Sequence, residues 1–285
     1  MSVLALRVAY HGGLLAGSQT QPGQRTVQHE IESSLSQLFQ RPAALVLAGR
    51  TDRGVHAVGQ IGSCADYRPD LMVDVMRSAV NARLAEDISV IAIERRPDGF
   101  HARFDARWRE YRYAIFVGPR DPMLRDRTWL RTEPLDADRM AQGAAMIVGE
   151  QDFAAIAGAG QGVPWAERPA GDRGTVRRML RCDCRALATP RGESLGTMLE
   201  IRAVADGFLP HMVRNIVGAL VEVGRGRREP SWIGELLASK DRRAGPMTAP
   251  AHGLTFWRVG YGRDEPDDRG WPTGWNESAS VPSVC

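Results

Sequence analysis

Residues 43–60 read AALVLAGRTDRGVHAVGQ, an apolar run that passes through a glycine-bounded turn into a second extended segment. Asp52 lies between Arg50 and Arg53, and Gly49 and Gly54 let the backbone bend on either side. A carboxylate fixed after a buried strand can act as a nucleophile or stabilise a developing cation. A surface turn with a charge pair explains the same spacing, so the pattern alone leaves the role of Asp52 open.

The composition is that of a globular chain. Its 285 residues are enough for one large or two medium domains, and 43% are apolar and 25% charged. No apolar run approaches the roughly 20 residues that a membrane helix needs. The opening MSVLALRVAY is too short and too broken for a signal peptide, so we expect a cytoplasmic protein without a membrane partner.

The cysteines and the basic residues give weaker signals. Cys64, Cys182, Cys184 and Cys285 suggest neither a disulfide framework nor a metal site, so we expect them to be structural and unreactive. The net charge of +3 argues only weakly for a nucleic-acid partner. All basic residues except Lys240 are arginine, but coding bias explains this as well as phosphate binding does.

Hydrophobic periodicity predicts alternating strands and helices in the first part of the chain. Helices are expected over 26–40, with Thr26 as N-cap, and over 70–84. The expected strands are 3–10, 43–50, 55–67, 88–96 and 104–118. This order is typical of a mainly antiparallel sheet with helices on one face.

The second part has a similar content. A hairpin is expected around TPRGE, a long loop over 157–175 and a closing strand over 252–262. Helices are expected over 135–149, capped by Gly149, over 210–224, with Pro210 in the first turn, and over 229–241. The prediction is an α+β (mixed α/β) fold of two similar halves, each a mainly antiparallel sheet with helices on one face, with an active-site cleft between them. The halves are 1–118 and 119–262, followed by a disordered tail, 263–285.

Five segments in one order carry a family resemblance. They are TVQ at 26–28, GRTDRGVHAVGQ at 49–60, FHARFDARWREYRY at 100–113, HMVRNIVG at 211–218 and GLTFWRV at 253–259. Together they resemble the tRNA pseudouridine synthase A family over residues 3–261. The resemblance implies an isomerase that converts uridine to pseudouridine in the anticodon stem-loop of tRNA, at tRNA positions 38, 39 and 40. It implies a homodimer, with no metal, nucleotide or other cofactor.

The resemblance also implies roles for single residues. Asp52 would be the catalytic carboxylate, Arg50 would hold the target nucleotide, and Arg214 would pair with Asp52. Tyr111 would stack on the extruded uracil, and Leu254 would pack on its other side. A base must leave its stack before its sugar can be reached, and aromatic stacking recovers roughly 1–3 kcal/mol of that cost. Without the resemblance, Tyr111 and Leu254 are ordinary core positions and Arg214 is an ordinary helix charge.

Arginine side chains are expected to contact the tRNA phosphates, which dominate affinity for nucleic acids. Alternation along the predicted strand 104–118 would direct its arginines to one face of the sheet. The candidates are Arg25, Arg103, Arg107, Arg109 and Arg112.

The match breaks in the first loop, YHGGLLAGSQTQ at 10–21. The family usually has Tyr-Asp-Gly, an aromatic residue and Gly-Trp-Gln there. This chain has His11, Leu15 and Ser18 in place of the aspartate, the aromatic residue and the tryptophan, and keeps Gly17, Gln19 and Gln21. We expect this loop to hold RNA differently.

Two other functions stay open at this stage. An RNA-binding protein with weak or no catalysis would fit the altered first loop, although a pure binder has no use for an acid between two arginines. A hydrolase would use Asp52 with His56 or His101, but it would need a second carboxylate or base beside the turn, and none is evident.

Overall fold

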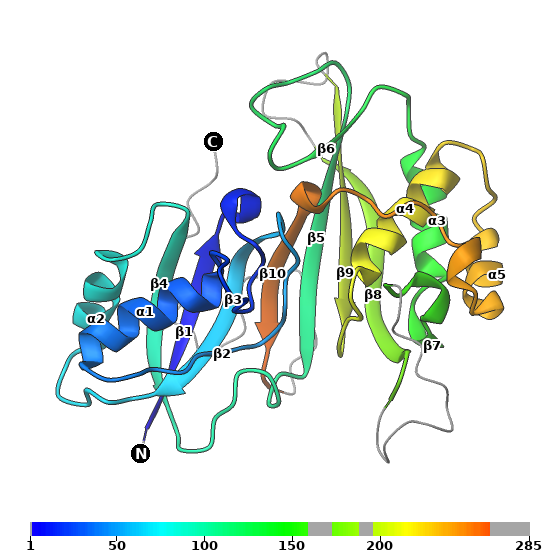
Figure 1. Cartoon of the computed structure of the whole chain (residues 1–285). Coiled ribbons are helices and arrows are strands. Elements are labelled where there is room, and N and C mark those ends of the chain that lie inside the picture. Colours follow the sequence, from blue (N-terminus) through cyan, green and yellow to red (C-terminus); the bar gives the residue numbers. More distant parts are fainter. Residues whose placement is uncertain (1, 159–172, 188–195, 263–285) are drawn as a thin grey trace. The chain divides into compact units, whose positions relative to one another are not determined.

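The computed structural model describes residues 2–158, 173–187 and 196–262 (Figure 1). Most of the expected loop 157–175, the TPRGE turn and the expected tail lie outside these residues. The chain forms two compact units. Unit 1 holds the residues up to Arg109 and the final strand from Thr255, and unit 2 holds Glu110–Leu254. The boundary at residue 118 and the duplicated architecture stay predictions.

Unit 1 is built on a mainly antiparallel sheet. Its strand order is β4–β1–β3–β10, and β2 also pairs with β3. β1 is antiparallel to β3 and β4, β2 is antiparallel to β3, and β10 runs parallel to β3. The strands are β1 (Val3–Tyr10), β2 (Val46–Leu47), β3 (His56–Ala65), β4 (Ile88–Arg96) and β10 (Leu254–Gly260).

Two helices, α1 (Val27–Phe39) and α2 (Val73–Asn81), cover one face of this sheet (Figure 1). Thr26 caps α1, because its hydroxyl accepts a hydrogen bond from the backbone N–H of His29 at 3.4 Å, as the sequence predicts. The apolar stripe of α1 is buried at each turn, which holds the helix against the core.

Unit 2 has the strand order β5–β9–β8–β7, and β6 pairs parallel to β5. β7, β8 and β9 are antiparallel neighbours, and α3 packs against β8 and α4. The predicted α+β class is confirmed. The strands are β5 (Trp108–Val117), β6 (Trp129–Arg131), β7 (Gly149–Asp152), β8 (Val176–Leu187) and β9 (Thr197–Ala205), and the helices are α3 (Ala137–Ala145), α4 (Met212–Gly224) and α5 (Trp232–Ser239).

The structure corrects several predicted boundaries. β5 begins at Trp108, four residues later than predicted, because residues before it form a turn. α3 ends at Ala145, and Gly149, with φ 110°, begins β7 instead of capping the helix. Pro210 precedes the N-cap of α4, His211, which has φ 60°. β6 and β7 were not predicted, since strands of three or four residues carry almost no periodic signal.

The described cysteines, Cys64, Cys182 and Cys184, are buried free thiols. Burial raises the pKa of Cys64 and of Cys184 to about 12, so neither is a thiolate near neutral pH. This agrees with the unreactive role expected for them, and Cys285 lies outside the described residues. No helix in the described part of the chain is long and apolar enough to cross a bilayer.

Candidate active site

Asp52 lies on the turn that joins β2 to β3 and is half-buried, whereas Arg50 is exposed. The turn closes through a hydrogen bond from Val55 N–H to the Asp52 carbonyl oxygen, at 3.2 Å. Gly54 has φ 83°, a left-handed conformation that favours glycine. The turn therefore needs a glycine at this position, as the sequence predicts.

The strand side of the turn is held by Gln60, whose side chain is fully buried. Its Nε2 donates to the Gly49 carbonyl oxygen at 2.8 Å, and its Oε1 accepts from Gly49 N–H at 3.3 Å. A Cβ at Gly49 would lie 2.7 Å from the ring of Phe256, so a larger residue would require either the Phe256 ring or the backbone that leads to Asp52 to shift.

The loop between β1 and α1 holds the other side of the turn. Ser18 is fully buried, and its hydroxyl accepts a hydrogen bond from Thr51 N–H at 2.8 Å. Its own N–H donates to the Thr51 carbonyl oxygen at 3.1 Å. The hydroxyls of Tyr10 and Thr51 are 2.8 Å apart, so three hydrogen bonds fix the residue that precedes Asp52.

Two glycines let the backbone of this loop pack directly on the turn. A Cβ at Gly12 would lie 2.1 Å from the Val55 carbonyl oxygen, and one at Gly17, which has φ 104°, would lie 2.8 Å from the Thr51 carbonyl oxygen. Gly12 N–H also donates to Nδ1 of His56 at 3.1 Å. Sequence reasoning missed this scaffold, and the two retained glycines are the signal that points to it.

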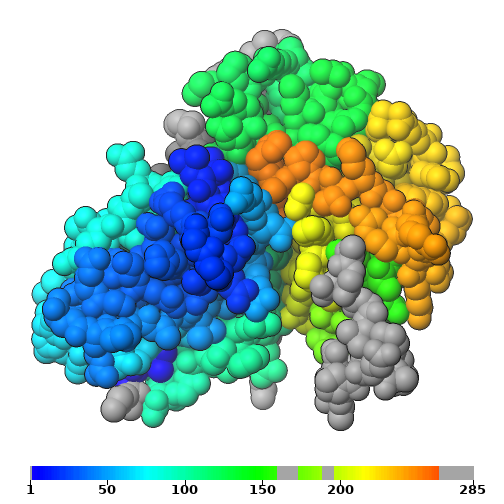
Figure 2. Space-filling view, in the orientation of Figure 1, coloured from blue at the N-terminus to red at the C-terminus, as the bar shows by residue number. Residues whose placement is uncertain are grey.

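The residues that depart from the family pattern belong to the same scaffold. The rings of His11 and His56 have centroids 4.5 Å apart, and Ser18 bonds the turn. The β1–α1 segment lies at the surface of unit 1 (dark blue in Figure 2). In this chain the loop between β1 and α1 therefore has a structural role, because it supports the Asp52 turn.

The candidate RNA-binding arginines do not share one face of a sheet. Arg103 and Arg107 are exposed on the turn before β5, since the strand begins only at Trp108. Arg109 and Arg112 do lie on β5, but residues three positions apart in a strand point to opposite faces. The predicted alternation is therefore wrong.

Two of these arginines are engaged by carboxylates of the chain. Arg25 forms two hydrogen bonds with Asp87, at 2.7 and 2.6 Å, which hold the pKa of the Asp87 carboxyl below its usual value. Arg112 donates to Glu110 at 2.9 Å. Glu110 is fully buried and also pairs with Arg202, at 2.8 Å.

Arg109 is engaged by three backbone carbonyl oxygens of unit 1. Its Nε and one terminal nitrogen donate to Ala48 at 3.2 and 3.1 Å. The other bonds go to Arg103 at 2.6 Å and to Ala106 at 3.0 Å. The Arg109 guanidinium thus joins the turn before β5 to the strand end that leads into the Asp52 turn.

Tyr111 lies on β5 in unit 2 and is only 6% exposed. Its ring meets Phe208 edge to face, with centroids 5.0 Å apart. The position is therefore well packed, and the second ring fixes the orientation of the first.

Arg214 and Leu254 are connected through the segment that leads into β10. Arg214 Nε donates to the Ala249 carbonyl oxygen at 2.8 Å, and Ala249 N–H donates back to the Arg214 carbonyl oxygen at 3.2 Å. The hydroxyl of Tyr113 donates to Pro250 at 2.8 Å. These bonds fix the approach to Leu254, which is 5% exposed.

Asp52 and Arg50 thus belong to unit 1, and Tyr111, Arg214 and Leu254 belong to unit 2. The pairing of Arg214 with Asp52 and the enclosure of uracil stay predictions.

The two histidines that a hydrolase would use have structural partners. His56 Nδ1 accepts from Gly12, and His101 Nδ1 accepts from the backbone N–H of Arg103 and Phe104 at 3.2 and 3.1 Å. An imidazole whose Nδ1 accepts a backbone N–H carries its proton on Nε2 when it is neutral, so Nε2 is then a donor and not a base, which weighs against the hydrolase alternative.

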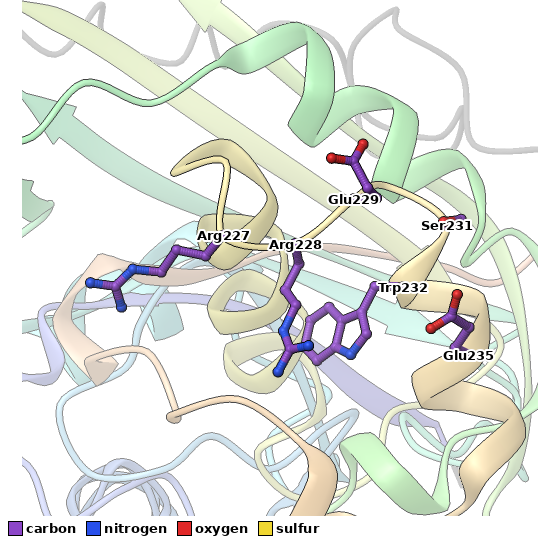
Figure 3. A pocket seen from close by; sticks show the side chains of 6 residues that line it. All are labelled: Arg227, Arg228, Glu229, Ser231, Trp232 and Glu235. Atoms are coloured by element: carbon purple, nitrogen blue, oxygen red, sulfur yellow. The ribbon is translucent and has the colours of Figure 1, made fainter.

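A pocket of about 300 Å³ lies in unit 2, around the start of α5 (Figure 3). The guanidinium of Arg228 lies over the ring of Trp232, 5.1 Å from its centroid. The pocket has two arginines and two glutamates, so its charges cancel, and none of the predicted site residues lines it. Its lining residues are Arg227, Arg228, Glu229, Ser231, Trp232 and Glu235.

Comparison with known proteins gives one consistent family. A family model described as tRNA pseudouridine synthase matches residues 13–105 and 144–262. The tRNA pseudouridine synthase A of Nitratidesulfovibrio vulgaris is 41% identical over 281 residues, which cover 92% of this chain and 100% of that protein. The protein of the same name from Methylococcus capsulatus is 38% identical over 260 residues, covering 90% of this chain and 89% of that protein. The chain belongs to the tRNA pseudouridine synthase family.

Proposed function

We propose that this protein isomerises uridine to pseudouridine in the anticodon arm of tRNA, at tRNA positions 38 to 40, with Asp52 as the catalytic carboxylate. The observation that carries the proposal is the Asp52 turn. Its backbone is fixed by hydrogen bonds from Thr51 N–H to the Ser18 hydroxyl and from the Gln60 side chain to the Gly49 carbonyl oxygen, while the Asp52 side chain is only half-buried. A carboxylate held in this way is preorganised for a reacting sugar or base.

The chemistry requires no second substrate. The bond from C1′ to N1 breaks, the uracil turns, and C5 bonds to C1′. The ring loses its proton at C5 and gains one at N1, so atoms and electrons balance. A carboxylate can serve by attacking C1′, by attacking the base or by taking the C2′ proton, and Asp52 is suited to each.

In this proposal, residues of both units act on one nucleotide. Arg50 binds it beside Asp52, and Arg214 pairs with the Asp52 carboxylate. Tyr111 stacks on the uracil and Leu254 packs against it, which keeps the free base in place while it turns. The family resemblance of the segments that hold Tyr111, Arg214 and Leu254 supports these roles. The proposal extends to a homodimer, as the family resemblance implies, and to a location in the cytoplasm.

The test is a product assay on unmodified tRNA, with pseudouridine mapped by carbodiimide treatment and primer extension. Wild type is expected to modify uridines of the anticodon arm, and Asp52→Asn is expected to bind tRNA but form no product. Asp70→Asn is the matched control, because it removes an exposed carboxylate from the same unit. Full activity of Asp52→Asn would refute the proposal. Binding without product by wild type would favour the RNA-binding alternative, and free uracil would favour a hydrolase.

A further inference from the structure

We infer that Phe104 is a stacking platform for an unpaired base of the RNA substrate, at a place separate from the nucleotide that reacts. The inference rests on the proposed function only in needing an RNA partner. Phe104 lies on the turn at residues 101–107, which connects the end of β4 to β5 in unit 1.

The ring of Phe104 is exposed and yet ordered. Its side chain is 77% exposed, which is costly for a phenyl ring in water. The ring stacks on His101, with centroids 4.3 Å apart and planes at 24°. Stacking on the imidazole fixes the plane of the phenyl ring, as an aromatic platform for a base requires.

The turn itself is preorganised. Asp105 accepts a hydrogen bond from His101 N–H at 2.9 Å, and His101 Nδ1 accepts from the N–H of Phe104. Ala102 is held on both sides, because its N–H donates to the Ser63 hydroxyl at 3.0 Å and its carbonyl accepts from the Tyr261 hydroxyl at 2.8 Å. A partner that binds here has little loop entropy to overcome.

The charges beside the ring favour RNA over another protein. Arg103 and Arg107 are exposed, and neither forms an ion pair within the described residues. The Arg103 guanidinium lies 5.9 Å from the Phe104 ring centroid. The carboxylate of the turn, Asp105, is bonded to His101 N–H. A stacking ring beside two unpaired cations suits a base and its flanking phosphates.

The position of the turn separates it from the reacting nucleotide. Ala102 is bonded to Ser63, seven positions beyond His56 along β3, whereas Asp52 lies before His56. At about 3.3 Å per strand residue, Ser63 lies on the order of 23 Å along β3 from His56. The Arg103 end of the turn is joined by Arg109 to Ala48, four positions before Asp52. Phe104 therefore contacts a different nucleotide from the one that is isomerised.

The experiment compares Phe104→Ala, Phe104→Trp and wild type for the Kd of unmodified tRNA and for kcat. Loss of one stacked base is expected to weaken binding about 5- to 150-fold, while kcat at saturating tRNA stays unchanged. Phe104→Trp should restore binding, because the indole offers a larger stacking face. Met72→Ala is the matched control, since Met72 is an apolar residue of unit 1 that is 71% exposed.

Three results would overturn the inference. The first is a Kd of Phe104→Ala for tRNA within twofold of the wild-type Kd. The second is a lower kcat of Phe104→Ala with an unchanged Kd. The third is weaker tRNA binding by Phe104→Ala together with a change in the molar mass of the protein, measured by light scattering. The last would make the turn a contact between two copies of the chain. A wild type that binds tRNA through Phe104 but forms no pseudouridine would keep the platform and refute the proposed function.

Discussion

Asp52 and Glu110 are two of the carboxylates that lie between arginines in the sequence, and the structure places them in contrasting surroundings. Asp52, between Arg50 and Arg53, is half-buried on a glycine-bounded turn of unit 1. Glu110, between Arg109 and Arg112, is fully buried on β5 of unit 2. The same local charge pattern therefore does not decide the role of the acid.

The difference lies in the backbone that carries each acid. A strand places Glu110 beside arginines of its own sheet. Its Oε2 accepts a hydrogen bond from Arg202 at 3.2 Å, its Oε1 accepts one from Arg112 at 2.9 Å, and Oε1 also forms an ion pair with Arg202 Nε at 2.8 Å. In the turn, the hydrogen bonds from Ser18 and Gln60 involve the main chain of residues that precede Asp52, and the Asp52 side chain is half-buried. A half-buried acid on a fixed backbone suits chemistry, whereas a fully buried acid whose two oxygens are both bonded within its own sheet suits structure.

The sharpest test of this comparison is Asp52→Asn, measured for both activity and stability. Pseudouridine formation is expected to fall more than about a thousandfold, because the essential carboxylate is lost. The free energy of unfolding in urea should fall by no more than about 1 kcal/mol, since the backbone bonds of the turn remain and an ion pair of a partly exposed carboxylate contributes little. A large loss of stability would show that Asp52, like Glu110, has a structural role.

The converse variant is Glu110→Ala, which leaves Arg202 buried without its carboxylate. The free energy of unfolding should fall by about 3–5 kcal/mol, the usual cost of breaking a buried ion pair from one side. Urea unfolding checks this, with Glu235→Ala as the control because Glu235 is exposed in the same unit. Equal unfolding midpoints for the two variants would show that the buried pair does not stabilise unit 2.

The role of Ser18 in positioning the Asp52 turn is tested by comparing Ser18→Ala with Ser34→Ala. Both serines are buried in unit 1, but Ser18 bonds Thr51, whereas Ser34 donates to Val80 O at 3.0 Å, between α1 and α2. Each variant should lose about 1–3 kcal/mol of stability. Only Ser18→Ala should lower kcat, by about 10- to 100-fold, because the reacting carboxylate shifts. Equal kcat values in the two variants would contradict a positioning role for Ser18.

The smallest expected effect concerns the ion pair of Arg25 and Asp87, which is partly exposed. Because the folded state lowers the pKa of Asp87, the pair stabilises the protein above the unfolded pKa and loses this effect as pH falls below about 4. Asp87→Asn should cost about 0.5–1 kcal/mol at pH 7, and the difference from wild type should shrink by pH 3. Urea unfolding at the two pH values measures it, and a difference that grows on acidification would reverse the assigned sign.

Long periodic segments of the fold were predictable from the sequence. β1 and β4 have the predicted bounds, and α1 differs by one residue at each end, because apolar side chains repeat along their whole length. The predicted strand 104–118 wrongly includes residues 104–107, because the turn at 101–107 is stabilised by the His101 imidazole and the Asp105 carboxylate, which a pattern of apolar residues does not register.

The candidate site was predictable in its residue types but not in its supports. The glycine-bounded turn and its aspartate stand out in the sequence. Ser18, in contrast, is noticeable there only because it stands where the family usually has a tryptophan. Its partner, Thr51, lies 33 positions away along the chain, and only the folded backbone brings the two together. A bond between a side chain and a distant main-chain N–H leaves no trace in composition or periodicity.

The fork of Arg109 constrains how this protein can vary. One planar guanidinium reaches three carbonyl oxygens, of Ala48, Arg103 and Ala106, in fixed directions. The compact ammonium of a lysine offers three donors around a single atom and cannot span that width. We therefore expect the position of Arg109 to be arginine even in a relative that has lysine at most other basic positions.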